Sequence, residues 1–375
     1  MNEVELDGPA LDGPAIRVPS QSAPRILFVP VSGTYGMGEY ARSLAIARAA
    51  SRQWPDAAIH FILSREAPYA ADAPFPATLL ASSPTFHSAA VIDVLEKWRP
   101  DVVIFDNAGR TAQLRAAQRL GARVVYISAR ARQRRKAFRV RWMRLIDEHW
   151  IAYPEFIAGR LRPLERLKLR MIGRPVIRYL DVILPRTDPA RRDAILARAG
   201  CAAQSFALVV PGGGTGHPGA NDAVGQFRAA ARALAARGVP TVFVGPGADE
   251  PEPNWHPFAT LPQADLAELM RSARLIIANG GSTLLQAIAC GKACIAVPIA
   301  KDQAERIRHC VAAGVAVDAT LDSASIVQAA DSQLRNEAQL AALAGRAGRL
   351  GLADGVELAL RALEGLIEPA IRGEA

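Results

Sequence analysis

Short apolar runs alternate with longer stretches of helical periodicity along this chain, and the alternation occurs twice. The first series lies between Arg25 and Ser128, and the second lies between Phe206 and Pro298. The apolar runs are rich in β-branched residues and almost uninterrupted, which is typical of parallel strands that are buried on both faces. Each series therefore predicts a parallel sheet covered by helices. We expect an α/β protein with two Rossmann-like domains that face a cleft, with ligands at the carboxyl ends of the strands.

The length of 375 residues suits two domains of ordinary size. A stretch with three prolines and no helical period separates the two series and is interpreted as a linker. The start of the chain is acidic, rich in proline and glycine, and contains the sequence LDGPA twice. The expected organisation is a flexible leader over 1–23, an N-terminal domain over 24–173, a linker over 174–189, a C-terminal domain over 190–352, and a C-terminal helix and tail over 353–375.

Composition and local patterns bear on where the protein works. No stretch contains the roughly 18 consecutive apolar residues of a membrane-spanning helix, and the N-terminus lacks the pattern of a secretory signal. The four cysteines form no CxxC pair, which favours a reducing cytoplasm and disfavours a metal site. We therefore expect a cytoplasmic protein with no cofactor and no bound metal.

The formal net charge is +9, and most of the cationic residues are arginines, which suit bidentate contacts with phosphate or carboxylate groups. Nucleic acid, an anionic membrane and phosphorylated small molecules are all compatible with such a charge. Aromatic residues make up only 6% of the chain, which disfavours the stacking surface used for single-stranded nucleic acid. We expect no nucleic-acid partner.

A glycine-rich loop over 31–42 follows the first apolar run and leads into the first helix. Its glycines would let a ligand approach the backbone, although many α/β proteins need such glycines only to turn the chain. Glu39, in the first helical turn, either complements the helix dipole or acts as a base at the cleft. Asp106, at the end of the strand over 102–105, is either the competing base or a residue that only stabilises a turn.

A second glycine-rich loop, over 211–219, occupies the corresponding place in the second series. It matches neither the Walker A motif nor the dinucleotide-binding motif. Its backbone N–H groups could hold a diphosphate, while its histidine could equally be an ordinary loop residue. The candidate binding residues in this loop are Gly213, Gly214, Thr215 and His217.

A third segment, over 278–307, contains an Asn-Gly-Gly-Ser-Thr turn, a helix, a strand that ends at Pro298, and an Asp-Gln pair. The order of these pieces resembles the C-terminal half of GT-B glycosyltransferases, in particular the MurG-type family of lipid-linked N-acetylglucosaminyltransferases of peptidoglycan synthesis. In that family the small-residue turn holds the donor diphosphate, a helix residue holds the nucleotide ribose, and a later polar pair contacts the donor sugar. The donor contacts that the resemblance implies come from Gly280, Gly281, Ser282, Thr283, Gln286, Asp302 and Gln303.

The resemblance covers about residues 25–350. Residues 172–177 look like the family's hinge, with Arg174 in place of Asn, and the first glycine-rich loop looks like its acceptor-side loop. We prefer Glu39 to Asp106 as the base because of its place in this loop. The acceptor-side residues that the resemblance implies are Gly33, Thr34, Gly36, Gly38 and Arg42.

Three further positions depart from the family's pattern. Gln286 stands where the ribose-binding residue is usually Glu, so its hydrogen bonds would be weaker. Arg306 replaces an Asn that follows the Asp-Gln pair, and Glu39 stands where a His is common. The pattern Gly-Met-Gly-x-x-x-Arg around Glu39 is also similar to the UDP-sugar hydrolase of the pseudaminic-acid pathway, which uses water as the acceptor.

A band of eight cationic residues without an intervening carboxylate covers Arg130 to Arg144. Phe138, Trp142 and Leu145 recur in and beside it at helical spacing, which predicts one amphipathic helix. Its apolar stripe could pack on the first domain and leave a solvated basic face. Alternatively, the helix could bring the protein to the anionic inner face of a membrane or to a phosphate-bearing acceptor.

The sequence thus favours a metal-independent, inverting glycosyltransferase that moves a sugar from a nucleotide donor, with a UDP-sugar preferred, to an acceptor hydroxyl. Lipid-linked and phosphorylated molecules are the candidate acceptors. Because no Asp-x-Asp pair occurs, helix N-termini and backbone N–H groups would stabilise the leaving diphosphate in place of a metal. The alternatives are a nucleotide-sugar hydrolase of the same fold and a non-catalytic subunit that binds nucleotide sugars.

Overall fold

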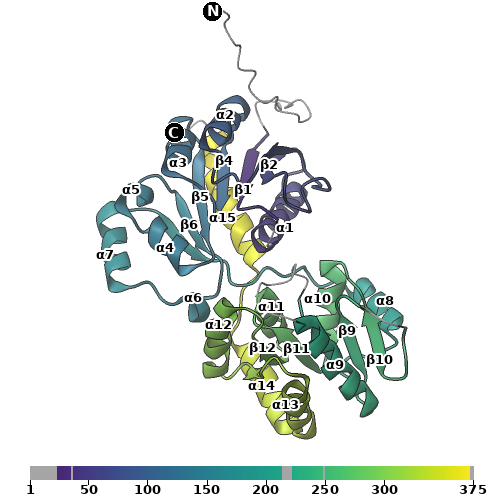
Figure 1. Cartoon of the computed structure of the whole chain (residues 1–375). Helices are drawn as coiled ribbons and strands as arrows, with labels where there is room; N and C mark the ends of the chain where they lie inside the picture. The colour runs from purple at the N-terminus through teal and green to yellow at the C-terminus, as the bar shows by residue number, and fades with distance from the viewer. Residues whose placement is uncertain (1–22, 35–36, 213–221, 248–249, 372–375) are drawn as a thin grey trace, which may run out of the picture. The chain divides into compact units, whose positions relative to one another are not determined.

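The computed structural model describes residues 23–34, 37–212, 222–247 and 250–371 (Figure 1). The expected leader lies almost entirely outside these residues. By their internal contacts the residues divide into two compact units. Of the described residues, the first unit comprises those up to Ala152, Arg160–Tyr179 and those from Val356 onward, and the second comprises those within Tyr153–Gly159 and Leu180–Gly355.

The first unit contains a seven-stranded parallel sheet with the strand order β3-β2-β1-β4-β5-β6-β7. Its strands are β1 (Arg25–Pro30), β2 (Ala58–Ser64), β3 (Ala77–Leu80), β4 (Val102–Asp106), β5 (Arg123–Ser128), β6 (Glu148–Ile151) and β7 (Val176–Tyr179). Its helices are α1 (Gly38–Gln53), α2 (Ser88–Trp98), α3 (Thr111–Arg119), α4 (Ala131–Ala137), α5 (Val140–Met143), α7 (Pro163–Ile172) and α15 (Gly355–Ile371), which begins at the unit boundary.

Both faces of the first sheet are covered, because successive side chains of its central strands point in opposite directions. Leu27 of β1 joins a buried core with Leu95 of α2 on one face. On the other face, Phe28 stacks on Phe61 of β2 with ring centroids 5.0 Å apart, and Tyr40 of α1 packs edge-on against Phe61. Burial on both faces explains why the strands read as continuous apolar runs in the sequence.

The second unit contains a six-stranded parallel sheet with the strand order β10-β9-β8-β11-β12-β13. Its strands are β8 (Ala207–Val210), β9 (Thr241–Val244), β10 (Trp255–Phe258), β11 (Leu275–Asn279), β12 (Ala293–Val297) and β13 (Val317–Asp318). Its helices are α6 (Glu155–Ala158), α8 (Pro189–Ala199), α9 (Ala223–Ala236), α10 (Gln263–Ser272), α11 (Ser282–Ala289), α12 (Lys301–Ala312), α13 (Ser323–Arg335) and α14 (Glu337–Arg349).

The second sheet also has a buried core on each face. Leu208 of β8 packs in a core with Leu284 of α11. Its neighbour Val209 points to the opposite core, which contains Phe227 of α9 and Ile326 of α13. Two parallel sheets, each flanked by helices, confirm the expected α/β fold with two Rossmann-like units.

Each strand order changes direction at one point, between β1 and β4 in the first sheet and between β8 and β11 in the second. The connections that leave the two strands at such a switch point run to opposite sides, so a crevice forms outside their carboxyl ends. Ligands of open α/β sheets bind in that crevice. The residues that follow β1, β4, β8 and β11 are therefore the places at which to look for a site.

The course of the chain differs from the expected boundaries in two segments. The expected linker contains β7, which pairs with β6 as the last strand of the first sheet. A four-residue edge strand that directly follows a proline carries too little periodicity to be recognised from sequence. Residues 153–159, expected in the first domain, belong to the second unit, where α6 packs against α12.

The basic band does not form the single amphipathic helix that its spacing predicts, so that expectation is wrong. α4 ends at Ala137, and α5 begins only at Val140. Phe138 and Trp142 are 3% and 1% exposed and pack inside the first unit, where the indole of Trp142 donates a hydrogen bond to Thr111 Oγ1 at 3.0 Å. Phe138 and Trp142 therefore face the protein core, as one of the two interpretations expected.

Within the described residues, no helix is long and apolar enough to cross a membrane. The four cysteines, which are Cys201, Cys290, Cys294 and Cys310, are free thiols in the second unit.

Candidate functional site

A buried ion pair at the switch point of the first sheet joins α1, the helix that follows β1, to the end of β4. Arg42, in the first half of α1, donates hydrogen bonds from Nε and Nη2 to the two carboxylate oxygens of Asp106 at 2.9 and 2.7 Å. Asp106 ends β4 and is 0% exposed, and Ser43 Oγ also lies 3.4 Å from its Oδ2. Asp106 thus holds α1 against the carboxyl end of β4.

The protonation of Asp106 follows from this burial. Removal from water raises the pKa of Asp106 to about 6, while the Arg42 guanidinium opposes the rise. Both oxygens accept hydrogen bonds inside the unit, and no part of the side chain meets solvent. An acceptor hydroxyl therefore has no direct access to this carboxylate.

Glu39 has the opposite surroundings. It lies in the first turn of α1 and is partly exposed. Its Oε1 accepts a hydrogen bond of 2.8 Å from Nδ2 of Asn107, the residue after β4. Asn107 adopts a left-handed conformation with φ 53°, and its Oδ1 accepts a hydrogen bond from the N–H of Ala129 at 2.9 Å. Asn107 therefore fixes Glu39 at the switch point, where Glu39 remains partly exposed.

The remaining acceptor-side candidates line the same loop, except for Gly36, which lies outside the described residues. Among the described residues, a Cβ atom added to Gly33 or Gly38 would meet no atom within 4 Å. Neither glycine is thus required by packing in the structure, and Thr34 is exposed. The loop has open space in front of its backbone, as the approach of a ligand requires.

The switch point of the second sheet is organised by Asn279, the last residue of β11. Its Nδ2 donates to the Pro211 carbonyl, just after β8, at 2.7 Å, and its Oδ1 accepts from the N–H of Gly281 at 2.7 Å. Gly212 lies so close that a Cβ atom there would be 2.0 Å from Asn279 Nδ2, and its φ of 104° also favours glycine. The buried side-chain amide of Asn279 therefore fixes the turn after β11 and connects it to the end of β8.

The glycines that follow Asn279 are required by packing, unlike those of the first loop. A Cβ atom at Gly280 would lie 2.7 Å from Ile307 and 2.9 Å from Gln303. At Gly281 it would lie 2.6 Å from Asn279 Oδ1. The close approach brings α12 up to the turn, and the Gly280 carbonyl accepts a hydrogen bond from Arg306.

Ser282 and Thr283 form the first turn of α11, whose N-terminus has no side-chain cap. Ser282 is exposed and Thr283 is partly exposed. The first N–H groups of a helix have no partner within the helix and carry a partial positive charge. This end of α11 is therefore suited to bind an anionic group such as a diphosphate.

The polar residues expected to hold the ribose and the sugar have structural partners in this form. Gln286 is 8% exposed, and its Nε2 donates to the Ile183 carbonyl at 2.8 Å. Gln303 is 5% exposed, and its Oε1 accepts from the N–H of Ile299 at 3.0 Å. Nothing is described for the side chain of Asp302. The candidate residues of the second loop, Gly213, Gly214, Thr215 and His217, lie outside the described residues.

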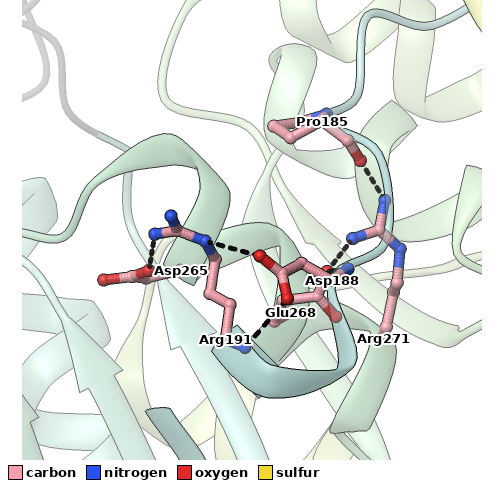
Figure 2. Close-up of polar contacts among 6 residues, drawn as sticks. All are labelled: Pro185, Asp188, Arg191, Asp265, Glu268 and Arg271. Atoms are coloured by element: carbon pink, nitrogen blue, oxygen red, sulfur yellow. Dashed lines mark hydrogen bonds and ion pairs between the residues drawn. The ribbon is translucent and has the colours of Figure 1, made fainter. Parts of the chain in front are cut away.

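The segment that Gln286 contacts is also fixed from the other side, by the network in Figure 2. The carboxylate of Glu268, in α10, is 0% exposed and accepts hydrogen bonds from the N–H of Asp188 at 2.9 Å and from Arg271 at 2.7 Å. Arg271 in turn donates to the Pro185 carbonyl. Residues 180–188 therefore have a defined path past α11, although their sequence shows only an irregular, proline-containing linker.

Arg306, the departure from the family's Asn, is a built-in part of this region. It is 9% exposed, and its guanidinium lies over the ring of Tyr153, 4.8 Å from the centroid. Together with its bond to the Gly280 carbonyl, this places a positive charge beside the turn.

Sequence reasoning missed the roles of Asn107 and Asn279. The one signal that they share is an Asn at or just after the end of a strand at a switch point.

No group of three or more His, Cys, Asp or Glu side chains that could hold a metal ion occurs within the described parts of the chain.

Comparison with known proteins gives a match at the level of structure. No protein-family model matches the sequence, and no curated protein matches it. Among solved structures, the chain is similar to MurG from Acinetobacter baumannii, with a TM-score of 0.60, 13% identity, and coverage of 91% of this chain and 99% of that one. LpCGTa in complex with UDP gives a TM-score of 0.60, 15% identity, and coverage of 92% and 99%.

A putative UDP-N-acetylglucosamine 2-epimerase from Listeria monocytogenes is similar as well, with a TM-score of 0.57, 13% identity, and coverage of 94% and 97%. These identities are low, so the likeness shows a shared fold over nearly the whole chain. It does not by itself separate sugar transfer from other reactions of nucleotide sugars.

Proposed function

Because the chain has the fold of the GT-B glycosyltransferases, as its sequence motifs predict, we propose that it transfers a sugar from a nucleotide donor to an acceptor hydroxyl. The observation that carries the proposal is the turn from Asn279 to Ser282, where a buried amide and two packing-required glycines present the uncapped N-terminus of α11. Such a turn suits a diphosphate. We propose a UDP-sugar as the donor, in line with the UDP bound to the similar structure LpCGTa.

On the acceptor side, Glu39 is the base in this proposal, and Asp106 positions α1. Glu39 Oε takes the proton of the acceptor hydroxyl as the acceptor oxygen bonds to the anomeric carbon of the sugar. The bond between that carbon and the β-phosphate oxygen breaks, and UDP leaves with the electron pair. Direct displacement of this kind inverts the configuration of the anomeric carbon.

The leaving diphosphate carries the charge that the reaction develops. In this proposal the N–H groups of Ser282 and Thr283 and the dipole of α11 stabilise it. Gly280 is essential because its missing side chain lets α12 pack against the turn. The reaction then requires no metal ion, and UDP binding is expected to be unchanged by a chelator.

The experiment that tests the donor site is calorimetric titration of UDP against Ser282→Asp. An added carboxylate at a helix N-terminus favours the helix but repels a diphosphate, so the fold is expected to persist while UDP binding is lost. Ser323→Asp, at the first position of α13 in the same unit, is the matched control and should leave UDP affinity unchanged. UDP binding that survives Ser282→Asp would contradict the assignment of the turn.

The hydrolase alternative uses the same groups, with Glu39 deprotonating water. It is favoured only by the pattern around Glu39 and Arg42, and it is separated from the transferase by one assay. Release of UDP from a UDP-sugar without any acceptor would support the hydrolase. A protein that binds UDP-sugars but shows no turnover, either alone or with any acceptor tested, would instead be a non-catalytic binding subunit.

We also propose that the protein works in the reducing cytoplasm, where its four cysteines would remain free thiols. There it would make a peripheral contact with the membrane. Helix α7, beside the basic band, has exposed apolar side chains that could enter such a membrane surface. Leu164, Leu167 and Met171 recur at positions i, i+3 and i+7 and are 61%, 53% and 77% exposed. Exposed Arg166 and Arg170 lie between them. An apolar stripe flanked by cations suits the surface of an anionic membrane.

A further inference from the structure

A cavity of about 480 Å³ lies in the first unit, beside the carboxyl ends of β4 and β5. Its walls come from three separate places: the loop before α2, the loop between β4 and α3, and the start of the basic band. Four of its lining residues are cationic, namely Arg110, Arg132, Lys136 and Arg139. We call it the cationic cavity.

The four cations have no carboxylate partner within the described residues. Arg110 donates from Nε to the Thr85 carbonyl at 2.9 Å, and Lys136 donates to the Gly109 carbonyl at 2.9 Å. These contacts orient the two side chains without neutralising their charge. Arg132 and Arg139 are exposed at the cavity.

Other arginines of the chain do form ion pairs with carboxylates, which neutralise their charge. Arg134, next along α4, turns inward and forms an ion pair with Glu165 at 2.8 Å. A second cavity, of about 520 Å³ between α9 and α13, contains Arg237 and Arg335, and both form ion pairs with Asp331. The cationic cavity is different because its positive charges converge on open space.

The crowding of positive charge is visible in the ionisation of Lys136. Burial, and to a smaller extent repulsion by the neighbouring arginines Arg110, Arg139, Arg132 and Arg141, together lower the pKa of Lys136 to about 8. Its ammonium also lies 4.1 Å from the centroid of the Trp142 ring. Holding like charges together in this way costs free energy, and a bound anion offsets that cost.

Two neutral groups give the cavity further definition. Gln133 lines it, and its buried Oε1 accepts no hydrogen bond from any residue that the structure describes. Asn107 forms part of the wall and is also the residue that holds Glu39, through the 2.8 Å hydrogen bond. Asn107 would therefore lie between an anion in the cavity and Glu39, the base assigned above.

We propose that the cationic cavity binds a phosphate or diphosphate group carried by the acceptor, so that the acceptor's hydroxyl reaches Glu39 while its anionic group contacts Arg110, Arg132, Lys136 and Arg139. The assignment of this anion to the acceptor rests on the proposed glycosyl transfer. Planar guanidinium groups bind phosphate oxygens in pairs, and Gln133 Oε1 accepts a hydrogen bond from a neighbouring hydroxyl. The phosphate belongs either to a soluble molecule or to the head group of a lipid.

The test is calorimetric titration of inorganic pyrophosphate in the presence of saturating UDP, which keeps the donor site filled. Arg132→Gln with Arg139→Gln is expected to weaken pyrophosphate binding by about tenfold or more, because two charge-assisted contacts are lost. The control, Arg135→Gln with Arg144→Gln, removes the same charge from exposed positions of the band outside the cavity and should change the affinity by less than about twofold.

Equal affinities for the cavity variant and the control, or no pyrophosphate binding beside UDP, would overturn the proposal. Binding of pyrophosphate that depends on Arg132 and Arg139 in a protein that does not bind UDP would keep the anion site and remove the proposed donor function. The source of the phosphate is then read from two further titrations, with glucose 1-phosphate in solution and with phosphatidylcholine vesicles that contain or lack farnesyl phosphate.

Discussion

Replacing Arg42 by Met is expected to destabilise the first unit by about 3–5 kcal/mol near pH 8, because it leaves the carboxylate of Asp106 buried without its partner. The side chains of the pair are 10% and 0% exposed, and two hydrogen bonds of 2.7 and 2.9 Å join them. What remains for Asp106 is the Ser43 hydroxyl at 3.4 Å, which cannot replace a guanidinium.

The penalty should depend on pH in a defined direction. The pKa of Asp106 is about 6 in the folded protein, above its ordinary value of 3.8, so the stability that this residue contributes is full at acid pH and is lost as the pH rises through about 6. Arg42 lowers that pKa. Without Arg42 the folded pKa rises further, and the loss of stability continues above pH 6. Arg42→Met should thus cost little near pH 5 and most near pH 8.

Urea unfolding at the two pH values measures this difference. The double variant Arg42→Met with Asp106→Leu, which removes both charges, should recover most of the lost stability. Arg48→Met, an exposed change on the same helix, is the control and should stay within about 0.5 kcal/mol. A cost for Arg42→Met below about 1 kcal/mol near pH 8, or an equal cost at both pH values, would refute the reasoning.

Three further outcomes are expected. Gln286→Ala should weaken UDP binding by about 1 kcal/mol in a calorimetric titration, and an unchanged affinity would remove Gln286 from the donor site. Asn279→Ala should lower the free energy of unfolding by about 1–3 kcal/mol, measured in urea, because the Pro211 carbonyl and the Gly281 N–H both lose a buried partner; no loss would show that the turn does not depend on this amide. Leu167→Ser should reduce co-sedimentation with anionic vesicles more strongly than added salt does, and equal binding to neutral vesicles would argue against the membrane contact.

The central strands of both sheets could be predicted from sequence, and the edges could not. β1, β4, β8 and β11 are buried on both faces and read as continuous apolar runs. β7 and β13 contain only four and two residues, and they lie at sheet edges where one side needs no partner strand. Such short segments carry no periodicity of their own, and the pairing with a neighbour decides their structure.

The candidate site was predictable as a set of loops but not as a set of contacts. The turn of residues 279–283 was predicted from its small residues, because close packing demands them, as Gly280 shows. The roles of Asn107 and Asn279 depend on hydrogen bonds to Glu39 and to Pro211, which are distant in sequence. The separation of Glu39 from Asp106 likewise depends on burial, since both are carboxylates near a strand end and only one is enclosed.

The basic band shows the limit of periodicity in another way. Phe138 and Trp142 have helical spacing, yet the helix is interrupted between α4 and α5. Phe138 reaches the core from the residue that follows α4, and Trp142 reaches it from α5. The cationic cavity arises because this interruption lies beside the loops after β3 and β4. That meeting of distant segments has no signature in the local sequence.

The most direct test of the central claim is the release of UDP from UDP-sugars, measured with and without a mixture of hydroxyl-bearing acceptors, for the wild type and Glu39→Gln. The account predicts that UDP release depends on an acceptor and falls about a hundredfold or more in Glu39→Gln, while the affinity for UDP is unchanged. Near-full turnover in Glu39→Gln would contradict the assigned base. A wild-type protein that neither binds UDP nor releases it from any UDP-sugar would contradict the proposed UDP-dependent glycosyl transfer.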